Sequence, residues 1–306
     1  MSASTPKNYR PETRLVHAGT LRSQFGETSE ALFLTQGYIY GSAEECEQRF
    51  AGKIPGYVYS RYSNPTMDMF EKRMAALEGA EAARSTATGM AAVTTALMGL
   101  VKTGDHVVAA KALFGSCRWV IEEWLPRFGV TSTLVDGTDL SQWKKAARKD
   151  TKAFFLESPT NPTLEVIDIA AVAEIAHKAG AKLVVDNVFA TPLLQKPLQL
   201  GADVVVYSAT KHIDGQGRCL GGVVLGKKEF IEEKLHNYLK HTGPSLSPFN
   251  AWVLLKGLET LSVRMKAHAE RALRIAQWLE RHPAVERVYY PGLTSHPQHE
   301  LAMRQQ

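Results

Sequence analysis

Short apolar stretches alternate with stretches of helical spacing over most of the chain after residue 64. Strands that alternate with helices in this way predict a mostly parallel sheet covered by helices on both faces, which is an α/β fold. Strands are expected at 106–110, 131–135, 153–157, 183–186, 204–207 and 221–225, and helices at 67–77, 116–125, 140–148 and 169–179.

Glycine and proline mark several of the expected helix ends. Gly79 and Gly180 follow the first and last of these helices, where a left-handed residue commonly closes a helix. Pro126 is expected to stop the helix at 116–125, because proline has no N–H to give to an intrahelical hydrogen bond.

The last part of the chain predicts a second, smaller α/β domain that is only begun. A long helical stretch follows Pro248, and its amphipathic second part at 265–279 is expected to end before Pro283. Residues 285–290 predict the first strand of a new sheet, and a polar tail, 304–306, follows. One strand does not make a domain, so we expect this chain to be part of a longer protein.

Composition is that of an ordinary globular protein. The 306 residues suffice for one large domain and part of another, with 44% hydrophobic and 22% charged residues. No apolar run approaches a membrane span, and the stretch Met1–Lys7 lacks the apolar core of a signal peptide. We therefore expect a cytoplasmic protein without a membrane partner.

Charges, cysteines and histidines argue against several kinds of partner. The net charge is +5, but no basic stripe is interleaved with aromatic residues, which disfavours nucleic-acid binding. The cysteines lack the spacing of a disulfide framework or zinc site, and Cys117 is interpreted as a packing residue. We expect a packed neutral ring at His212 and exposed loop positions for His296 and His299, with no metal site.

The strand predicted at 204–207 leads into a lysine, Lys211, with two hydroxyl residues before it, Ser208 and Thr210. A desolvated lysine has a lowered pKa and becomes a nucleophilic amine, as in enzymes that bind a carbonyl group through lysine. The two hydroxyls could then bind a phosphate beside that linkage. From this segment alone, a lysine whose side chain reaches water from the strand end is an equally good interpretation.

The strand predicted at 183–186 ends in an acid, Asp186. A carboxylate at the end of a strand in the same sheet as Lys211 suits a protonated pyridine nitrogen, which pyridoxal phosphate requires beside its lysine. Taken alone, Asp186 is better interpreted as a turn residue at the strand end or a helix cap.

The segment Ser85–Ala92 predicts a loop that enters a helix. Helix N-termini bind phosphate through their N–H groups, and Gly89, followed by Met90, would let the backbone approach closely. An ordinary capped helix start is the alternative interpretation.

These three segments, in this order, resemble the Cys/Met-metabolism family of pyridoxal-phosphate enzymes. Two further motifs match: Tyr57–Thr66, with the sequence YVYSRYSNPT, and Glu157–Pro162, with the sequence ESPTNP. The resemblance runs from about Thr13 to the last residue, and the motifs are highly specific as a set. It implies an aspartate-aminotransferase-like large domain of fold type I with a sheet of seven strands.

The resemblance also implies roles for individual residues. Lys211 would be the catalytic residue that holds pyridoxal 5′-phosphate and shuttles protons, and Asp186 would keep the pyridine protonated. The cofactor-binding residues would be Tyr59, Arg61, Gly89, Met90, Phe114, Asn161, Asp186, Ser208, Thr210 and Lys211. The arginine for the substrate α-carboxylate lies beyond residue 306 in such enzymes.

The domains implied are an N-terminal arm at 1–62, a cofactor-binding domain at 63–256 and the beginning of a C-terminal domain at 257–306. The arm is broken by prolines and glycines but rich in tyrosine. In enzymes of this kind such an arm packs on a neighbouring subunit and brings Tyr59 and Arg61 to that subunit's phosphate. The resemblance therefore implies a homo-oligomer, a dimer of dimers, whose sites are shared between subunits. Without the resemblance, an ordinary surface loop that carries Tyr59 and Arg61 would be the preferred interpretation.

Phe114 bears on the reaction. Many relatives carry a tyrosine there, whose ring stacks on the cofactor and whose hydroxyl can protonate a leaving group. Phenylalanine keeps the stacking and loses the acid. A carboxylate such as succinate or acetate needs little protonation to depart, whereas a thiolate does, so Phe114 favours an O-acylhomoserine substrate and γ-replacement by sulfide.

Several alternatives stay open at this point. Cysteine instead of sulfide would make the enzyme a cystathionine γ-synthase, and an acetyl ester or γ-lyase activity on methionine are further options. A non-catalytic α/β protein that only binds a phosphate ligand would need no lysine linkage. A nicotinamide dehydrogenase is disfavoured, because no G-x-G-x-x-G follows the first strand.

Overall fold

The structure is a computed structural model that describes residues 9–306. The first eight residues of the predicted arm, including the stretch Met1–Lys7, lie outside the described residues. The chain forms two compact units: the first joins the residues up to Ala92 with Ser208–Glu259, and the second joins Val93–Tyr207 with Thr260–Gln306. The division into an arm, a cofactor-binding domain and a C-terminal domain stays a prediction.

The strands form a mixed, mostly parallel sheet of seven strands in the order β1-β7-β6-β5-β4-β2-β3. β1 and β7 pair antiparallel, whereas the pairs from β6 to β3 are parallel. The strands are β1 Ala82–Thr86, β2 His106–Ala110, β3 Thr131–Val135, β4 Thr151–Glu157, β5 Lys182–Asp186, β6 Val204–Ser208 and β7 Gly222–Gly226. The predicted α/β class is confirmed, and each predicted strand of this sheet lies within two residues of an observed one.

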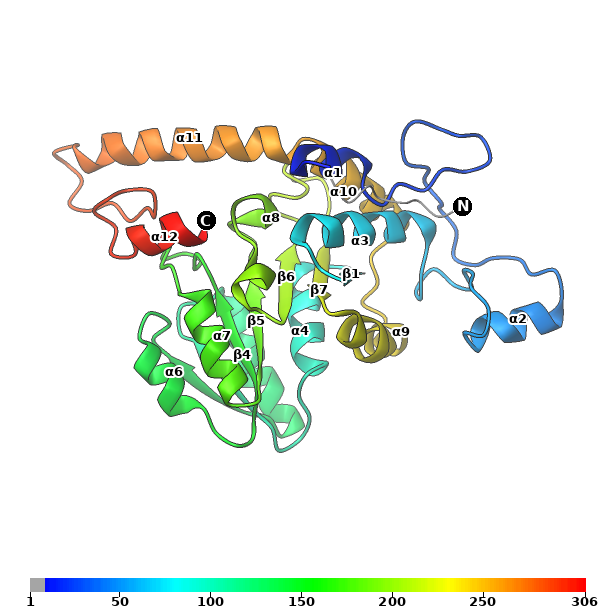
Figure 1. Cartoon of the computed structure of the whole chain (residues 1–306), viewed down its shortest axis with the longest axis horizontal. Coiled ribbons are helices and arrows are strands. Elements are labelled where there is room, and N and C mark those ends of the chain that lie inside the picture. The colour runs from blue at the N-terminus through cyan, green and yellow to red at the C-terminus, as the bar shows by residue number, and fades with distance from the viewer. Residues whose placement is uncertain (1–8) are drawn as a thin grey trace. The chain divides into compact units, whose positions relative to one another are not determined.

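In the second unit the apolar strands are buried because helices cover them. The helices α6 Leu140–Ala146 and α7 Ile169–Lys178 lie side by side against the sheet (Figure 1). Trp143 of α6 is fully buried and stacks on Phe154 of β4, with ring centroids 5.7 Å apart. Its indole N–H donates to the Gly137 carbonyl at 2.9 Å, so the ring is buried without an unpaired donor.

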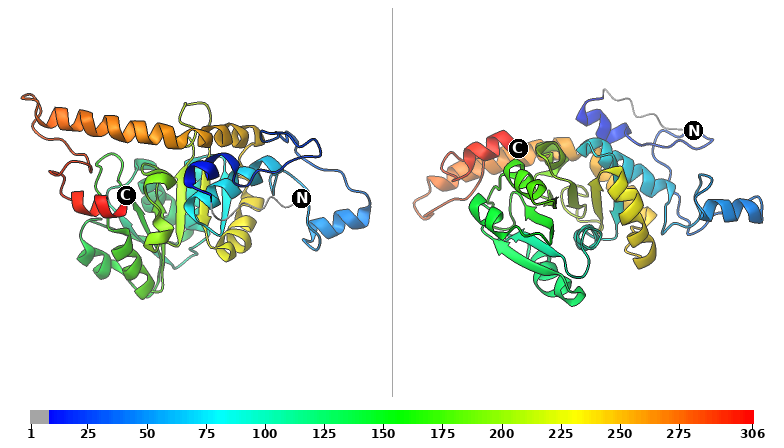
Figure 2. Two further views of the ribbon diagram at one scale, coloured as in Figure 1. Left: turned by 45° about the horizontal axis from the view of Figure 1, so that its top comes forward. Right: turned by 60° about the horizontal axis from the view of Figure 1, so that its bottom comes forward.

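In the first unit the helix α3 Pro65–Glu78 packs on β1 and on the helix α10 Pro248–Glu259 (Figure 2). Local sequence fixes both ends of α3. The Asn64 side chain accepts a hydrogen bond from the Thr66 N–H at the start, and Gly79 adopts φ 82° at the end, as predicted. The apolar face of α3 buries methionines and Phe70.

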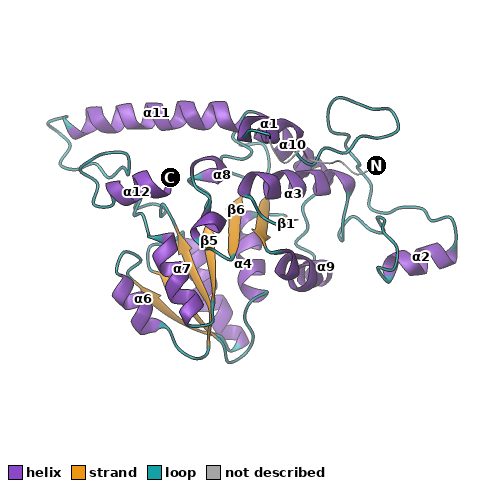
Figure 3. Ribbon diagram, in the orientation of Figure 1, coloured by secondary structure: helices purple, strands orange, loops and turns teal. Residues whose placement is uncertain are grey.

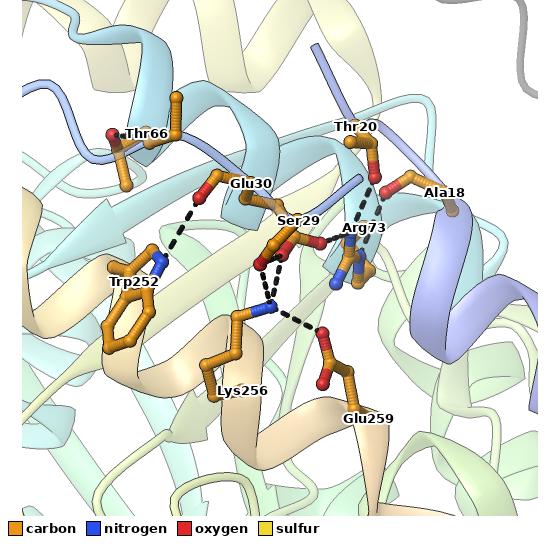
Figure 4. Close-up of polar contacts among 10 residues, drawn as sticks. Ala18, Thr20, Ser29, Glu30, Thr66, Arg73, Trp252, Lys256 and Glu259 are labelled. Atoms are coloured by element: carbon orange, nitrogen blue, oxygen red, sulfur yellow. Dashed lines mark hydrogen bonds and ion pairs between the residues drawn. The ribbon is translucent and has the colours of Figure 1, made fainter. Parts of the chain in front are cut away.

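A buried ion network ties residues 18–30 of the arm to α3 and α10 (Figure 4). Arg73 donates to the Ala18 carbonyl, to the Thr20 hydroxyl and to the Glu30 carboxylate. Lys256 donates to Glu30 as well, and these two cations hold the pKa of Glu30 at about 2 although burial alone would raise it. The arm segment is therefore fixed to its own chain by paired charges in the interior.

The helix predicted at 116–125 is a run of three consecutive helical segments of different type, and the run continues past Pro126. The run consists of α5 Gly115–Trp119, the π-helix η1 Val120–Trp124 and the 3-10 helix η2 Leu125–Phe128. Pro126 lies in the first turn of η2, where a proline is tolerated because no N–H is needed. Gly129, with φ 72°, ends the run instead.

The predicted strand at 285–290 is wrong. These residues form no strand and pair with none of those described; without a partner strand, their backbone groups must bond elsewhere. The tail contains the helix α12 His299–Gln305, and Gln305 is buried, with its amide nitrogen donating to the Ile167 carbonyl at 3.0 Å. His296 is buried rather than exposed, because its ring Nε2 bonds the Leu164 carbonyl, and His299 is half-buried at the start of α12.

Figure 3 colours the helices of the chain purple. The helices not yet named are α1 Pro11–His17, α2 Ala43–Phe50, α4 Gly89–Met98, α8 Thr191–Leu194, η3 Pro197–Leu200, η4 Glu229–Leu235, α9 His236–Thr242 and α11 Leu261–Glu280. The predicted loop at Ser85–Ala92 is corrected in its first part, because Ser85 and Thr86 end β1 and pair with β7. Within residues 9–306, no helix has the length and hydrophobicity needed to cross a membrane.

Candidate active site

Lys211 lies three residues beyond the end of β6, in the turn that follows the strand. Its backbone N–H donates to the Ser208 carbonyl at 3.3 Å, and its own carbonyl accepts from the Gly215 N–H at 2.7 Å. The side chain is exposed in this chain, which corrects the expectation of a desolvated amine. The reason is its place past the strand end, where the buried residues of β6 no longer surround it.

Thr210 holds the lysine turn against the start of β7. Its hydroxyl donates to the Gly221 carbonyl at 3.3 Å and accepts from the Gly221 N–H at 3.1 Å. Both contacts lie within the first unit. The Thr210 side chain, which was predicted to bind phosphate, thus fixes the backbone just before Lys211.

Gly89, the first residue of α4, packs against Ser208 so closely that no side chain would fit. A Cβ atom placed on Gly89 would lie 2.4 Å from the Ser208 Cβ and 2.6 Å from its Oγ. Gly222 approaches the same loop from β7, where a Cβ atom would lie 2.2 Å from the Thr88 carbonyl oxygen. The predicted helix start, with Met90 as its second residue, is thus brought together with Ser208 in the first unit.

Thr88 caps this helix. Its hydroxyl accepts the Ala91 N–H at 3.0 Å, and its carbonyl accepts the Ala92 N–H at 3.1 Å. The N-terminus of α4 therefore lies beside Ser208. The free N–H groups and the positive dipole end of a helix N-terminus suit an anion such as phosphate.

Tyr59 and Arg61 lie together in the first unit, beside a cavity of about 520 Å³. The Arg61 guanidinium carbon is 5.3 Å from the Tyr59 ring centroid and 5.0 Å from that of Tyr62. Arg61 also donates to the Lys240 carbonyl of its own chain. Tyr59 and Arg61, which were predicted to bind the cofactor phosphate of a neighbouring subunit, thus lie side by side in the arm.

In the second unit Asp186 ends β5 as a buried acid. Its side chain is 8% exposed and accepts the Val188 N–H at 3.1 Å. Burial raises the pKa of Asp186 to about 7, because a single amide donor compensates little of the lost hydration. A carboxyl in this environment gains from a positively charged partner.

A second acid, Glu157, ends the neighbouring strand β4 and was not predicted as a site residue. It is 1% exposed, and its pKa is raised to about 8 by burial and by the nearby Asp186. The signal was present in the sequence, since Glu157 ends an apolar strand as Asp186 does. What the sequence did not reveal is that the two strands are neighbours.

Phe114 and Asn161 both contact Glu157 through their backbones. The Phe114 N–H donates to Glu157 Oε2 at 3.0 Å, and the Asn161 N–H also lowers the pKa of Glu157 as a donor. The Phe114 ring is 43% exposed at the N-cap of α5, and Asn161 is half-buried. Three of the predicted ring-binding residues, Phe114, Asn161 and Asp186, thus converge around one carboxyl.

Cys117 and His212 were predicted to be packing residues. Cys117 is 2% exposed, and burial together with Asp186 and Glu157 raises the pKa of its thiol well above its ordinary value. The thiol is therefore neutral, as expected of a packing residue. His212 is half-buried, and the described part of the chain contains no cluster of three His, Cys, Asp or Glu side chains suited to a metal ion.

The chain belongs to the Cys/Met metabolism PLP-dependent enzyme family, whose model matches residues 12–306. It is 58% identical to the O-succinylhomoserine sulfhydrylase of Mycobacterium tuberculosis H37Rv over 95% of this chain and 71% of the relative. It is 55% identical to the O-succinylhomoserine sulfhydrylase of Pseudomonas aeruginosa PAO1 over 96% of this chain and 73% of the relative.

A solved structure gives the same assignment for the fold. It is a provisionally assigned O-acetylhomoserine (thiol)-lyase, metY, from Campylobacter jejuni, which contains a pyridoxyl-lysine monophosphate. It matches with a TM-score of 0.92 and 32% identity, over 97% of this chain and 82% of that one. The predicted type I fold of pyridoxal-phosphate enzymes is confirmed.

The residues of each unit fit a part of pyridoxal phosphate. In the first unit the N-terminus of α4, which Gly89 lets pack against Ser208, offers N–H groups beside the Ser208 hydroxyl, and these groups suit a phosphate. In the second unit the buried carboxyl of Asp186, with one amide donor, suits a protonated ring nitrogen.

The close approach of Gly89 to Ser208 leads to a stability prediction. We expect Gly89→Ala to lower the free energy of unfolding by ~1–3 kcal/mol, because its Cβ would overlap Ser208. The matched control is Gly115→Ala at the start of α5, where a Cβ meets nothing within 4 Å. The control should be neutral or stabilising by up to about 1 kcal/mol. Urea denaturation measures both, and equal effects would contradict the close approach.

Proposed function

We propose that this chain catalyses the replacement of the succinyl group of O-succinylhomoserine by sulfide, giving homocysteine and succinate for methionine biosynthesis. The observation that carries this proposal is the identity of 58% and 55% to two O-succinylhomoserine sulfhydrylases over 95% and 96% of the chain. A cytoplasmic location is proposed with it, as suits a biosynthetic enzyme.

Lys211 is proposed as the catalytic residue. When bound, pyridoxal phosphate supplies an electron sink that stabilises the charge left after a substrate C–H bond breaks. The Lys211 Nζ atom would hold the cofactor covalently. As a free amine, the same atom would take the proton from the substrate α-carbon and return a proton to the product. Its exposed position beyond β6 leaves the amine free to reach substrate.

Asp186 is proposed to keep a proton on the ring nitrogen of the cofactor. A positive ring nitrogen beside this buried carboxyl would lower the pKa of Asp186 from about 7 and hold it ionised, which is the state that favours the proton on the ring. Asn161 is proposed to bond the phenolic oxygen of the cofactor. Gly89, Met90, Ser208 and Thr210 are proposed to bind its phosphate.

Phe114 is proposed to stack on the cofactor and to bias the choice of leaving group. It offers no hydroxyl near the substrate γ-carbon, so it donates no proton to a departing group. Succinate is stable as an anion at neutral pH, because its carboxyl has a pKa near 4 (~4.3 for a comparable side chain). A thiolate from methionine or cystathionine would depart without the donor that it needs.

The chain should therefore prefer acyl esters to thioethers. We expect O-succinylhomoserine with sulfide to be consumed much faster than methionine or cystathionine alone, and Phe114→Tyr to raise thioether cleavage more than acyl replacement. One panel of steady-state rates checks this: succinyl- and acetyl-homoserine, each with sulfide or cysteine, beside the two thioethers.

Each other result of the panel points to a different enzyme. Faster cleavage of thioethers than of acyl esters would contradict the proposal and indicate a γ-lyase. A preference for cysteine over sulfide would indicate a cystathionine γ-synthase, and a preference for the acetyl ester an O-acetylhomoserine sulfhydrylase.

We further propose that the enzyme is a homo-oligomer, a dimer of dimers, whose sites are shared between subunits. Tyr59 and Arg61 support this, because they lie on the arm, away from the lysine turn in sequence, and carry groups suited to phosphate. In this assembly they would bind the phosphate held by a neighbouring subunit.

Mixing two inactive variants tests the shared site. In the proposed assembly each site takes Lys211 from one subunit and Arg61 from the other. A hybrid of the Arg61→Ala and Lys211→Ala variants therefore contains one site with both residues and one site with neither. We expect partial recovery of activity, up to about a quarter to a half of the wild-type rate, by this counting of sites, once the subunits have exchanged. Neither variant should recover when incubated alone. Absence of recovery after subunit exchange, verified by mass spectrometry of the hybrids, would contradict sharing.

A further inference from the structure

Glu157 and Asp186 occupy matching positions at the ends of two neighbouring parallel strands. β4 and β5 pair in register, with Glu157 opposite Asp186. Residues paired across adjacent strands point their side chains to the same face of a sheet. Both acids are therefore directed to one side of the second unit, and both are buried.

The carboxyl of Glu157 lies beside two segments that are distant in sequence from each other. The Phe114 N–H, at the start of α5, donates to its Oε2 at 3.0 Å. The backbone N–H of Asn161, after β4, lies near enough to lower the pKa of Glu157. Since Phe114 is the N-cap of α5 and has no polar side chain with which to cap, Glu157 supplies an acceptor at this end of the helix.

We propose that Glu157 is a positioning residue for the cofactor ring: its carboxyl holds the Phe114 backbone by a hydrogen bond and lies beside the Asn161 backbone, next to Asp186. The inference rests on the proposed function, through the roles given there to those three residues. Glu157 itself takes no part in bond making or breaking.

The environment of Glu157 also determines its charge. The groups that act on it are Asp186 from β5 and the neutral thiol of Cys117 from α5. Burial and the charge of Asp186 raise the pKa of Glu157 to about 8, so the acid holds its proton at neutral pH. Its second oxygen, Oε1, has no hydrogen-bond partner among the described residues, which suits a protonated oxygen better than a buried charge.

A neutral acid with one accepting oxygen is closely imitated by an amide. Glu157→Gln keeps an oxygen for the Phe114 N–H and replaces the hydroxyl by an amide nitrogen. Glu157→Ala removes the acceptor and leaves the Phe114 N–H without it. The two variants therefore separate the hydrogen bond from the mere presence of a side chain.

The experiment uses the enzyme loaded with pyridoxal phosphate and measures the dissociation constant of the cofactor and its visible circular dichroism, which reports how the ring is held. We expect Glu157→Gln to stay within about threefold of the wild-type dissociation constant, with an unchanged dichroic band. Glu157→Ala should raise the constant roughly tenfold to a hundredfold and weaken the band, because the lost acceptor leaves a donor unsatisfied.

A control variant separates positioning from loss of stability. Ile175→Ala, on α7 in the same unit, removes a buried apolar side chain that makes none of these contacts. It should lower stability without changing the dichroic band. If it weakens the band as much as Glu157→Ala does at equal loss of stability, Glu157 is merely structural and the inference is overturned.

The dependence on pH provides a second readout. Below the Glu157 pKa of about 8 the acid is neutral, so wild type and Glu157→Gln should give the same dichroic band. Above it the wild type gains a second negative charge that glutamine cannot carry, and the two bands should diverge. An alanine-like effect of Glu157→Gln at neutral pH, or a wild-type band in Glu157→Ala, would overturn the inference. A wild-type protein that binds no cofactor would instead contradict the proposed function.

Discussion

The parallel, in-register pairing of β4 with β5 is the constraint on which the ring-binding half of the candidate site depends. It brings the strand-end acids Glu157 and Asp186 to matching positions, and burial raises the pKa of both. Two adjacent buried carboxyls cannot both be ionised at low cost, so one must keep a proton or meet a positive charge. In the proposed site a protonated pyridine nitrogen would meet this need for Asp186, while Glu157 would keep its proton and accept the Phe114 N–H.

The phosphate-binding half depends on a steric constraint instead. Gly89 lies so close to Ser208 that a side chain on the glycine would not fit. Gly222 lies just as close to the Thr88 carbonyl. Glycine at these positions lets a helix start and a strand end pack against each other, which presents N–H groups and hydroxyls together. The chemistry of the two halves is complementary: one suits an anion, and the other suits a cationic ring.

Much of this was predictable from the sequence, because apolar strands and the polar residues at their ends can both be read locally. Lys211, Asp186 and Gly89 were predicted as site residues in this way. β1 was missed, because its sequence, AARST, has no apolar run, and its existence depends on β7. The strand expected at 285–290 failed for the opposite reason: its pattern is suitable, but it has no partner. Glu157 required the strand order, and the burial of His296 and Gln305 required contacts with distant residues.

The central claim is that Lys211 holds the cofactor, and chemical trapping tests it most directly. The protein loaded with pyridoxal phosphate is reduced with borohydride, digested, and its labelled peptide identified by mass spectrometry, beside Lys211→Ala and a control, Lys240→Ala, which changes another lysine of the first unit. The label is expected on Lys211 in the wild type and in the control, and on no residue in Lys211→Ala. A label on another lysine of the wild type, or none at all, would contradict the claim.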